Sequence, residues 1–239
     1  MFVSYFLLYS YCVVLYTCFD SVLCFFICKV PIVSYKVEEV TVHLVPVNNA
    51  TISADQAFLQ QRINEIYNPA VVNVTVVVEP TLSAPEFSGT IHDIENHTLS
   101  NYTPEMIGLR RLVKQQDYHR ASEYYLMVVE GMEPSGTEGF MPRKRHYGFL
   151  NAAVLGSPEK TARVAAHELG HGAWHLQHPF HQFNGAQEGG TQTLMDYGEG
   201  SEVLRYQWGE VHDPVSNFTL FDDDGEGESV ARQKFVLFT

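Results

Sequence analysis

Apolar residues follow two patterns along most of the chain, one typical of strands and the other typical of helices. Strand patterns, built from alternating or β-branched apolar residues, occur at residues 36–47, 71–78, 124–129 and 147–155. Helical spacing occurs between a Ser53-Ala54-Asp55 start signal and an Asn68-Pro69 stop, and again at residues 104–116. Residues 79–103 are rich in Pro, Ser, Thr and Asn and are expected to form a long loop.

A third helix is expected to begin after Ser157, which can act as N-cap ahead of Pro158 and an acidic Glu159 in the first turn. Its apolar stripe, which we expect to face a core, consists of Ala165, Leu169, Gly172 and Ala173. Residues 202–212 have the pattern of a closing helix. Because strands and helices alternate along the chain, the predicted fold class is α/β with a mixed, twisted sheet.

The first thirty residues differ from the rest, because they are almost wholly apolar and aromatic, with only Asp20 and Lys29 charged. A signal peptide would show a basic start and a small-residue cleavage site, and neither is visible. A transmembrane helix needs about twenty apolar residues, which residues 1–28 supply, although Asp20 would be costly in a membrane. We therefore expect residues 1–30 to be a hydrophobic leader or membrane anchor, or else a mis-assigned start upstream of the true one.

The remaining chain divides into an expected globular domain, residues 31–215, and an acidic tail, residues 216–239. The acidic side chains of the tail are Asp222, Asp223, Asp224, Glu226 and Glu228. A calcium loop needs a fixed ligand spacing that this run lacks, so the sequence favours a solvated tail.

Composition excludes several classes of protein. Hydrophobic residues make up 45% of the chain and charged residues 18%, which is typical of a globular domain. The formal net charge of -13 would repel phosphate backbones, so we expect no nucleic-acid partner. The cysteines lie at positions 12, 18, 24 and 28. The globular part therefore cannot be a disulfide scaffold, a cysteine protease or a cysteine-ligated metal site.

The candidate chemistry lies in the third helix, where residues 167–171 read HELGH. His167 and His171 are four residues apart, so their imidazoles can meet on a single metal ion. Glu168 is placed to reach a water that such an ion would hold. This pattern, HExxH, supplies two zinc ligands and a general base from one helix.

A catalytic zinc also needs a third protein ligand and an open position for water. His175 continues the row of histidines, but a rise of about 1.5 Å per residue carries it roughly 12 Å along the helix from His167. The third ligand must therefore follow a turn of the chain. His178 and His181 are the nearby candidates, and Gln177 is a poor one.

Residues 167–178 (HELGHGAWHLQH) and the downstream TLMDYG at residues 193–198 resemble the metzincin zinc peptidases. That family carries HExxHxxGxxH followed by a methionine turn below the metal. The ending of the first motif and the MDY turn look most like the pappalysin or cytophagalysin branch. Two departures are visible: the third histidine, His178, falls one residue late, and Trp174 or His175 stands where the family has glycine.

The resemblance implies a zincin-like α+β fold and a role for each matching residue. His167, His171 and His178 would bind one zinc ion, with His181 as the alternative to His178. Met195 would pack below the ligands, although an ordinary core methionine would look much the same. Tyr197, two residues later, would hydrogen-bond the oxyanion of the transition state, or would simply be a packing tyrosine.

The function that follows is a zinc metalloendopeptidase acting on a protein or peptide substrate. Zinc would lower the pKa of a bound water, and Glu168 would take its proton and pass it to the leaving amine. In metzincins an edge strand pairs with the extended substrate, and residues 147–153 are the candidate for that edge. A peptidase behind a hydrophobic leader would be extracytoplasmic, either secreted or membrane-anchored through residues 1–28.

Two alternatives remain open from the sequence. A gluzincin-type peptidase would take a downstream glutamate as third ligand, and the candidates are Glu188, Glu199 and Glu202. The turn around Met195 argues against it. A catalytically silent zinc-binding or adhesion module would keep the fold without the activity, but such a module has no use for the base Glu168.

Overall fold

The computed structural model describes residues 8–17, 23–32, 35–92, 102–183 and 185–213. The chain forms two compact units, Met1–Lys36 and Val37–Thr239, which we treat separately. The expected acidic tail, residues 216–239, lies outside the described residues.

The first unit contains two antiparallel strands, β1 (Leu8–Thr17) and β2 (Leu23–Ile32). Their register places Cys12 opposite Cys28. Tyrosine and valine make up half of β1, and phenylalanine, isoleucine and valine make up half of β2; these residues favour extended backbone. The described residues of this unit are therefore strands, and not the transmembrane helix that the apolar run also allowed. Among the described residues of the whole chain, no helix is long and apolar enough to cross a membrane. A role of residues 1–28 as leader or anchor stays a prediction.

The second unit is built on a five-stranded sheet in the order β4-β3-β6-β9-β8. Its strands are β3 (Glu38–Pro46), β4 (Val72–Val78), β6 (Tyr124–Val129), β8 (Gly139–Phe140) and β9 (Tyr147–Asn151). The strands β4, β3, β6 and β9 run parallel to one another. At one edge of the sheet, β8 pairs antiparallel with β9. This mostly parallel sheet with helices confirms the predicted α/β class.

Two strand predictions need correction. The strand expected at residues 147–155 ends at Asn151, whose side chain donates to the Thr137 carbonyl and accepts from the Ala153 backbone in a turn. This strand is also flanked on both sides, by β6 and β8, so it is not the edge strand that we expected. The edge belongs to the two-residue strand β8, which carried no visible pattern in the sequence.

The long loop at residues 79–103 holds one short element in its described part, β5 (Thr90–Ile91). This strand pairs in parallel with β7 (Gly131–Met132), forming a separate two-stranded sheet. Residues 93–101 of the loop lie outside the described chain.

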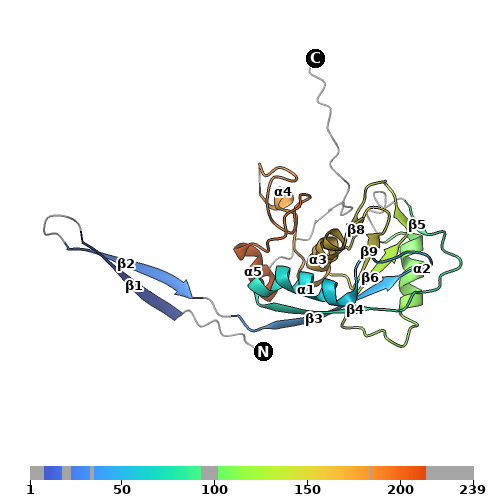
Figure 1. Cartoon of the computed structure of the whole chain (residues 1–239), viewed down its shortest axis with the longest axis horizontal. Coiled ribbons are helices and arrows are strands. Elements are labelled where there is room, and N and C mark those ends of the chain that lie inside the picture. The colour runs from blue at the N-terminus through green and yellow to red at the C-terminus, as the bar shows by residue number, and fades with distance from the viewer. Residues whose placement is uncertain (1–7, 18–22, 33–34, 93–101, 184, 214–239) are drawn as a thin grey trace, which may run out of the picture. The chain divides into compact units, whose positions relative to one another are not determined.

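Helices cover both faces of the main sheet (Figure 1). On one face pack α1 (Gln56–Tyr67), η1 (Asn68–Ala70), α3 (Pro158–Trp174) and α5 (Arg205–His212). On the other face packs α2 (Pro104–Val113). Strand β3 shows the alternation behind this arrangement, because Val42 and Leu44 enter the first core and Val45 enters the second.

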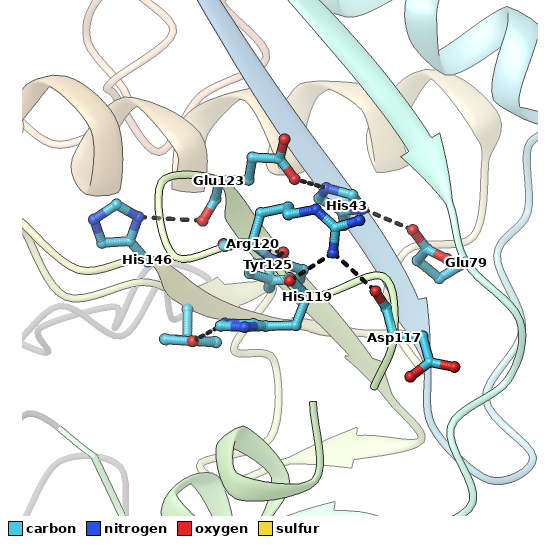
Figure 2. Close-up of polar contacts among 9 residues, drawn as sticks. His43, Glu79, Asp117, His119, Arg120, Glu123, Tyr125 and His146 are labelled. Atoms are coloured by element: carbon cyan, nitrogen blue, oxygen red, sulfur yellow. Dashed lines mark hydrogen bonds and ion pairs between the residues drawn. The ribbon is translucent and has the colours of Figure 1, made fainter. Parts of the chain in front are cut away.

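A polar group, which we call the His43 cluster, lies around β3 and the starts of β6 and β9 (Figure 2). Its members are His43, Glu79, His119, Glu123, Tyr125, His146 and Tyr147. The His43 ring nitrogens lie 2.7 Å from Glu79 Oε1 and 2.8 Å from Glu123 Oε2. His119 Nε2 lies 2.7 Å from the Tyr147 hydroxyl, and His146 Nδ1 lies 3.1 Å from the Glu123 carbonyl oxygen. These contacts tie β3, β6 and β9 to the loops around them.

Candidate metal centre

Helix α3 starts as the sequence predicts, with the Ser157 hydroxyl accepting from the Lys160 backbone N–H and Pro158 in the first turn. The expected apolar stripe faces the core, because Ala165 and Leu169 lie in it and Ala173 packs against it, but burial extends beyond the stripe to every residue from 161 to 172. Small residues, alanine and glycine, make this possible by letting neighbours pack closely all round the helix. The helix therefore lies inside the molecule between the sheet and the C-terminal segment, and its polar side chains are buried with it.

The end of α3 is a wide turn. His175 takes the left-handed conformation with φ 60° and ψ 23°, which a non-glycine residue adopts at modest cost. Both its N–H and that of Leu176 donate to the Gly170 carbonyl, five and six residues back. This turn reverses the chain, so that His178 comes back towards the helix just ahead of α4 (Pro179–Gln182).

Three buried histidines meet at this point. The Nε2 atoms of His167 and His171 are 3.0 Å apart, and each lies 3.2 Å from Nε2 of His178. Among the described residues, these three are the group of His, Cys, Asp or Glu side chains whose ligand atoms converge closely enough for one metal ion. We call them the histidine triad.

Hydrogen bonds to backbone carbonyls fix the tautomer of two of these rings. His167 Nδ1 donates to the Leu194 carbonyl at 2.8 Å, and His171 Nδ1 donates to the Leu176 carbonyl at 2.7 Å. Their protons are thus on Nδ1 and their Nε2 lone pairs point at each other. Lone pairs at 3.0 Å repel unless a cation lies between them.

The spacing of the triad fits a zinc ion. Tetrahedral zinc with Zn–N bonds of about 2.0–2.1 Å holds its nitrogen ligands about 3.3–3.4 Å apart, close to the distances in the triad. The carbonyl partners of His167 and His171 are the kind of outer contact that orients zinc-bound imidazoles.

The protonation of the triad also suits a metal. Burial lowers the pKa of His167 and of His178 well below the ordinary 6.5, and the neighbouring His171 lowers both further. Burial likewise lowers the pKa of His171 to about 3. All three rings are therefore neutral near pH 7, and neutral imidazole is the form that binds metals.

Glu168 is held between the helix and the edge strand. Its side chain is buried, with 2% of the residue exposed. A Cβ placed on Gly139 of β8 would lie 2.9 Å from the Glu168 carboxyl carbon, so only glycine leaves room for the carboxylate. The candidate general base thus lies directly beside the edge strand.

The segment after the triad, residues 193–197, folds into a tight turn below α3. Met195 is fully buried. Its sulfur would lie 2.9 Å from a Cβ placed on Gly170, the residue of α3 that comes directly before His171. The carboxylate of Asp196 fixes the turn by accepting from the backbone N–H groups of Gly189, Thr191 and Tyr197 and from the Thr191 hydroxyl. The turn places the ring of Tyr197 next to that of His178, and the two ring centroids are 4.8 Å apart.

Arg163 is a residue of this site that the sequence patterns did not reveal. It lies one helical turn before His167 and is 8% exposed. Its guanidinium donates to the carbonyls of Gly200 at 2.9 Å, Asp196 at 2.6 Å and Leu194 at 3.5 Å. The Leu194 carbonyl is also the partner of His167. A lone arginine in an otherwise apolar stretch of helix was the signal that could have revealed it.

The alternative ligands lie elsewhere. His181 is exposed, with its ring centroid 5.6 Å from that of His178, and it is outside the converging group. Glu188, Glu199 and Glu202 are exposed as well. Helix α5, the expected closing helix, packs behind the turn, where Gln207 Oε1 accepts from the Thr193 hydroxyl.

Comparison with known proteins gives little beyond this geometry. No protein-family model matches the chain, and no curated protein sequence matches it. A solved structure that it resembles is archaemetzincin from Methanopyrus kandleri, with 16% sequence identity and a TM-score of 0.42, covering 72% of this chain and 93% of that one. We therefore take the chemistry of the site from its own side chains.

Proposed function

We propose that this protein is a zinc-dependent metallopeptidase of the metzincin type. The observation that carries the proposal is the convergence of three buried Nε2 atoms next to the carboxylate of Glu168. The motifs of residues 167–178 and 193–198 favour the pappalysin branch within that type.

His167, His171 and His178 hold the single zinc ion in this proposal. When bound, such an ion polarises the scissile carbonyl and lowers the pKa of a coordinated water towards 7. Glu168 accepts the proton of the attacking water and delivers it to the leaving amine. Tyr197, beside His178, donates a hydrogen bond to the oxyanion as negative charge develops there.

The substrate backbone pairs with β8 in this proposal, rather than with residues 147–153 as the sequence suggested. One side of β8 is taken by β9, and β8 is the last strand of the sheet on that side. Gly139 of β8 contacts Glu168, so a peptide laid along this strand brings its backbone past the base.

The wide turn at the end of α3 accounts for the late position of the third histidine. A turn in which His175 and Leu176 both donate to Gly170 contains more residues than an ordinary helix end. The additional residue relative to the metzincin spacing is accommodated there, and His178 still reaches His167 and His171.

The test compares wild type with Glu168→Gln, and uses Glu159→Gln, an exposed position on the same helix, as control. We expect Glu168→Gln to keep its zinc and to lose about 10²–10⁴-fold in peptide hydrolysis, the usual contribution of a general base. Zinc content is measured by mass spectrometry and turnover with a mixture of unstructured peptides. Full activity in Glu168→Gln would contradict the proposed function.

A further inference from the structure

The loop that joins β8 to β9, residues 141–146, carries a concentration of positive charge that the proposed mechanism does not use. Its sequence is MPRKRH, so three of the 15 Lys and Arg residues of the chain are consecutive, at Arg143, Lys144 and Arg145. The chain as a whole has a net charge of -13. We call residues 141–146 the basic loop.

The basic loop is attached to the last turns of α3, at the histidine triad. The Lys144 N–H lies 3.4 Å from the His171 carbonyl oxygen. A Cβ placed on the next residue, Gly172, would lie only 2.7 Å from the Arg145 carbonyl oxygen, so loop and helix are in close contact. The loop therefore borders the candidate metal centre.

Its conformation is a defined turn. The Arg145 N–H donates to the Pro142 carbonyl at 3.2 Å, which leaves Arg143 and Lys144 at the corner of the turn. Lys144 has φ 63°, a left-handed conformation that glycine would adopt at lower cost. At the end of the loop, His146 stacks on Tyr124 with ring centroids 4.7 Å apart. The charges are thus carried by an ordered support.

The charge of Arg143 reaches the triad. Burial is the main cause of the low pKa of His171 and of His178, and the positive charge of Arg143 lowers both further. Salt screens interactions between exposed charges over roughly 8–10 Å. The backbone of the basic loop itself contacts the His171 carbonyl, which is much closer than this length.

We propose that the basic loop makes the enzyme selective for peptides with Asp or Glu within two residues of the scissile bond. This inference rests on the proposed peptidase function. A peptide paired with β8 runs past Gly139, beside Glu168, and on towards Phe140 and the loop that follows. The corner of the turn at Arg143 and Lys144 then faces a side chain close to the bond that is cut. A carboxylate there gains charge-assisted hydrogen bonds, and a basic side chain is repelled.

The experiment uses internally quenched peptides that are identical except for Glu or Gln at one position within two residues of the scissile bond, on either side. The kcat/KM ratio of the Glu peptide to the Gln peptide is measured for zinc-loaded wild type, Arg143→Gln and Arg111→Gln. Arg111 is exposed on α2, on the other face of the sheet, so its variant matches the change in net charge. Anisotropy of the same peptides, singly labelled and bound to Glu168→Gln, gives a readout that does not need turnover.

For wild type and for Arg111→Gln we expect a ratio of about 10 in favour of Glu, as for one hydrogen bond to a charged group, which decreases as salt is added. For Arg143→Gln we expect a ratio near 1. Equal cleavage of both peptides by wild type would overturn the selectivity and leave the peptidase function standing. A preference that survives in Arg143→Gln would overturn the role of this arginine.

The binding measurement decides the case in which no peptide is cleaved. Tighter binding of the Glu peptide would then support the selectivity and contradict the peptidase function. Equal binding of both peptides without cleavage would contradict both.

Discussion

Two groups of histidines in this protein look alike in composition and differ in what their ring nitrogens face. In the His43 cluster, each ring nitrogen with a close partner lies against oxygen: a carboxylate, a hydroxyl or a carbonyl (Figure 2). In the histidine triad, two Nδ1 atoms lie against carbonyl oxygens, but all three Nε2 atoms lie against one another.

This difference separates a hydrogen-bonded network from a metal site. Protons alone satisfy the His43 cluster, because a proton can lie between each of these nitrogens and the oxygen that it faces. Protons do not satisfy the triad, because burial keeps its rings neutral and their lone pairs converge. Burial of histidines is therefore a poor indicator of a metal, and convergence of their lone pairs is a good one.

The largest effect should come from removing one member of each group. His171→Ala should weaken zinc binding by more than about 100-fold, since changes in the outer contacts alone already cost 10–100-fold. His43→Ala should keep wild-type zinc affinity but lower the free energy of unfolding of the zinc-free protein by about 3 kcal/mol, because it leaves Glu79 and Glu123 without their shared partner. Zinc titration and urea denaturation measure the two effects, and weaker zinc binding in His43→Ala would break the comparison.

The next largest effect is expected on turnover, when the space that Gly139 leaves for the Glu168 carboxylate is filled. Gly139→Ala should lower kcat by up to about 100-fold while zinc affinity stays unchanged, because a Cβ at this position displaces the Glu168 carboxylate. Gly156→Ala is the matched control, since a Cβ there meets no atom within 4 Å. Steady-state kinetics with zinc titration would show the effect, and an active Gly139→Ala enzyme would mean that Glu168 needs no such space.

A smaller effect should follow at Arg163. Arg163→Lys keeps the charge but loses the planar fork that reaches the carbonyls of Leu194, Asp196 and Gly200. We expect zinc affinity to fall about tenfold, since Leu194 also orients His167. Arg62→Lys, at the surface of α1, serves as control. Unchanged zinc affinity would restrict Arg163 to a purely structural role.

The sequence predicted the parts of this site that depend on local signals. The N-cap at Ser157, the pairing of His167 with His171 at helical spacing and the strands β4 and β6 all follow from neighbouring residues. The direction of the chain after the helix was also foreseeable, because a straight helix could not bring a third histidine to the same metal.

The rest depends on contacts between distant residues. The His43 cluster joins positions 43, 79 and 123, and no spacing in the sequence connects them. Strand β8 has two residues and is defined only by its pairing with β9. The carbonyls that Arg163 reaches lie more than thirty residues further on, at Asp196 and Gly200. The strands at residues 8–17 and 23–32 were missed because an apolar run fits a helix and a strand equally well.

A pH dependence of the free energy of unfolding is also expected from the triad. The pKa of His171 is about 3 in the folded protein, against an ordinary value of 6.5, so the unfolded chain binds more protons between these values. The free energy of unfolding of the zinc-free protein should therefore fall as the pH falls from 6.5 towards 3, by at most about 1.4 kcal/mol per pH unit for this residue. Urea denaturation at several pH values measures the slope. In His171→Phe the slope should be shallower, and an identical slope would contradict a buried neutral His171.

The most direct test of the central claim is the zinc content of the full chain by mass spectrometry, for wild type, His178→Ala and His181→Ala. The convergence of Nε2 atoms predicts one zinc per chain in wild type and in His181→Ala, and loss of zinc in His178→Ala. Zinc retained in His178→Ala, or a wild-type chain that takes up none after reconstitution, would contradict it.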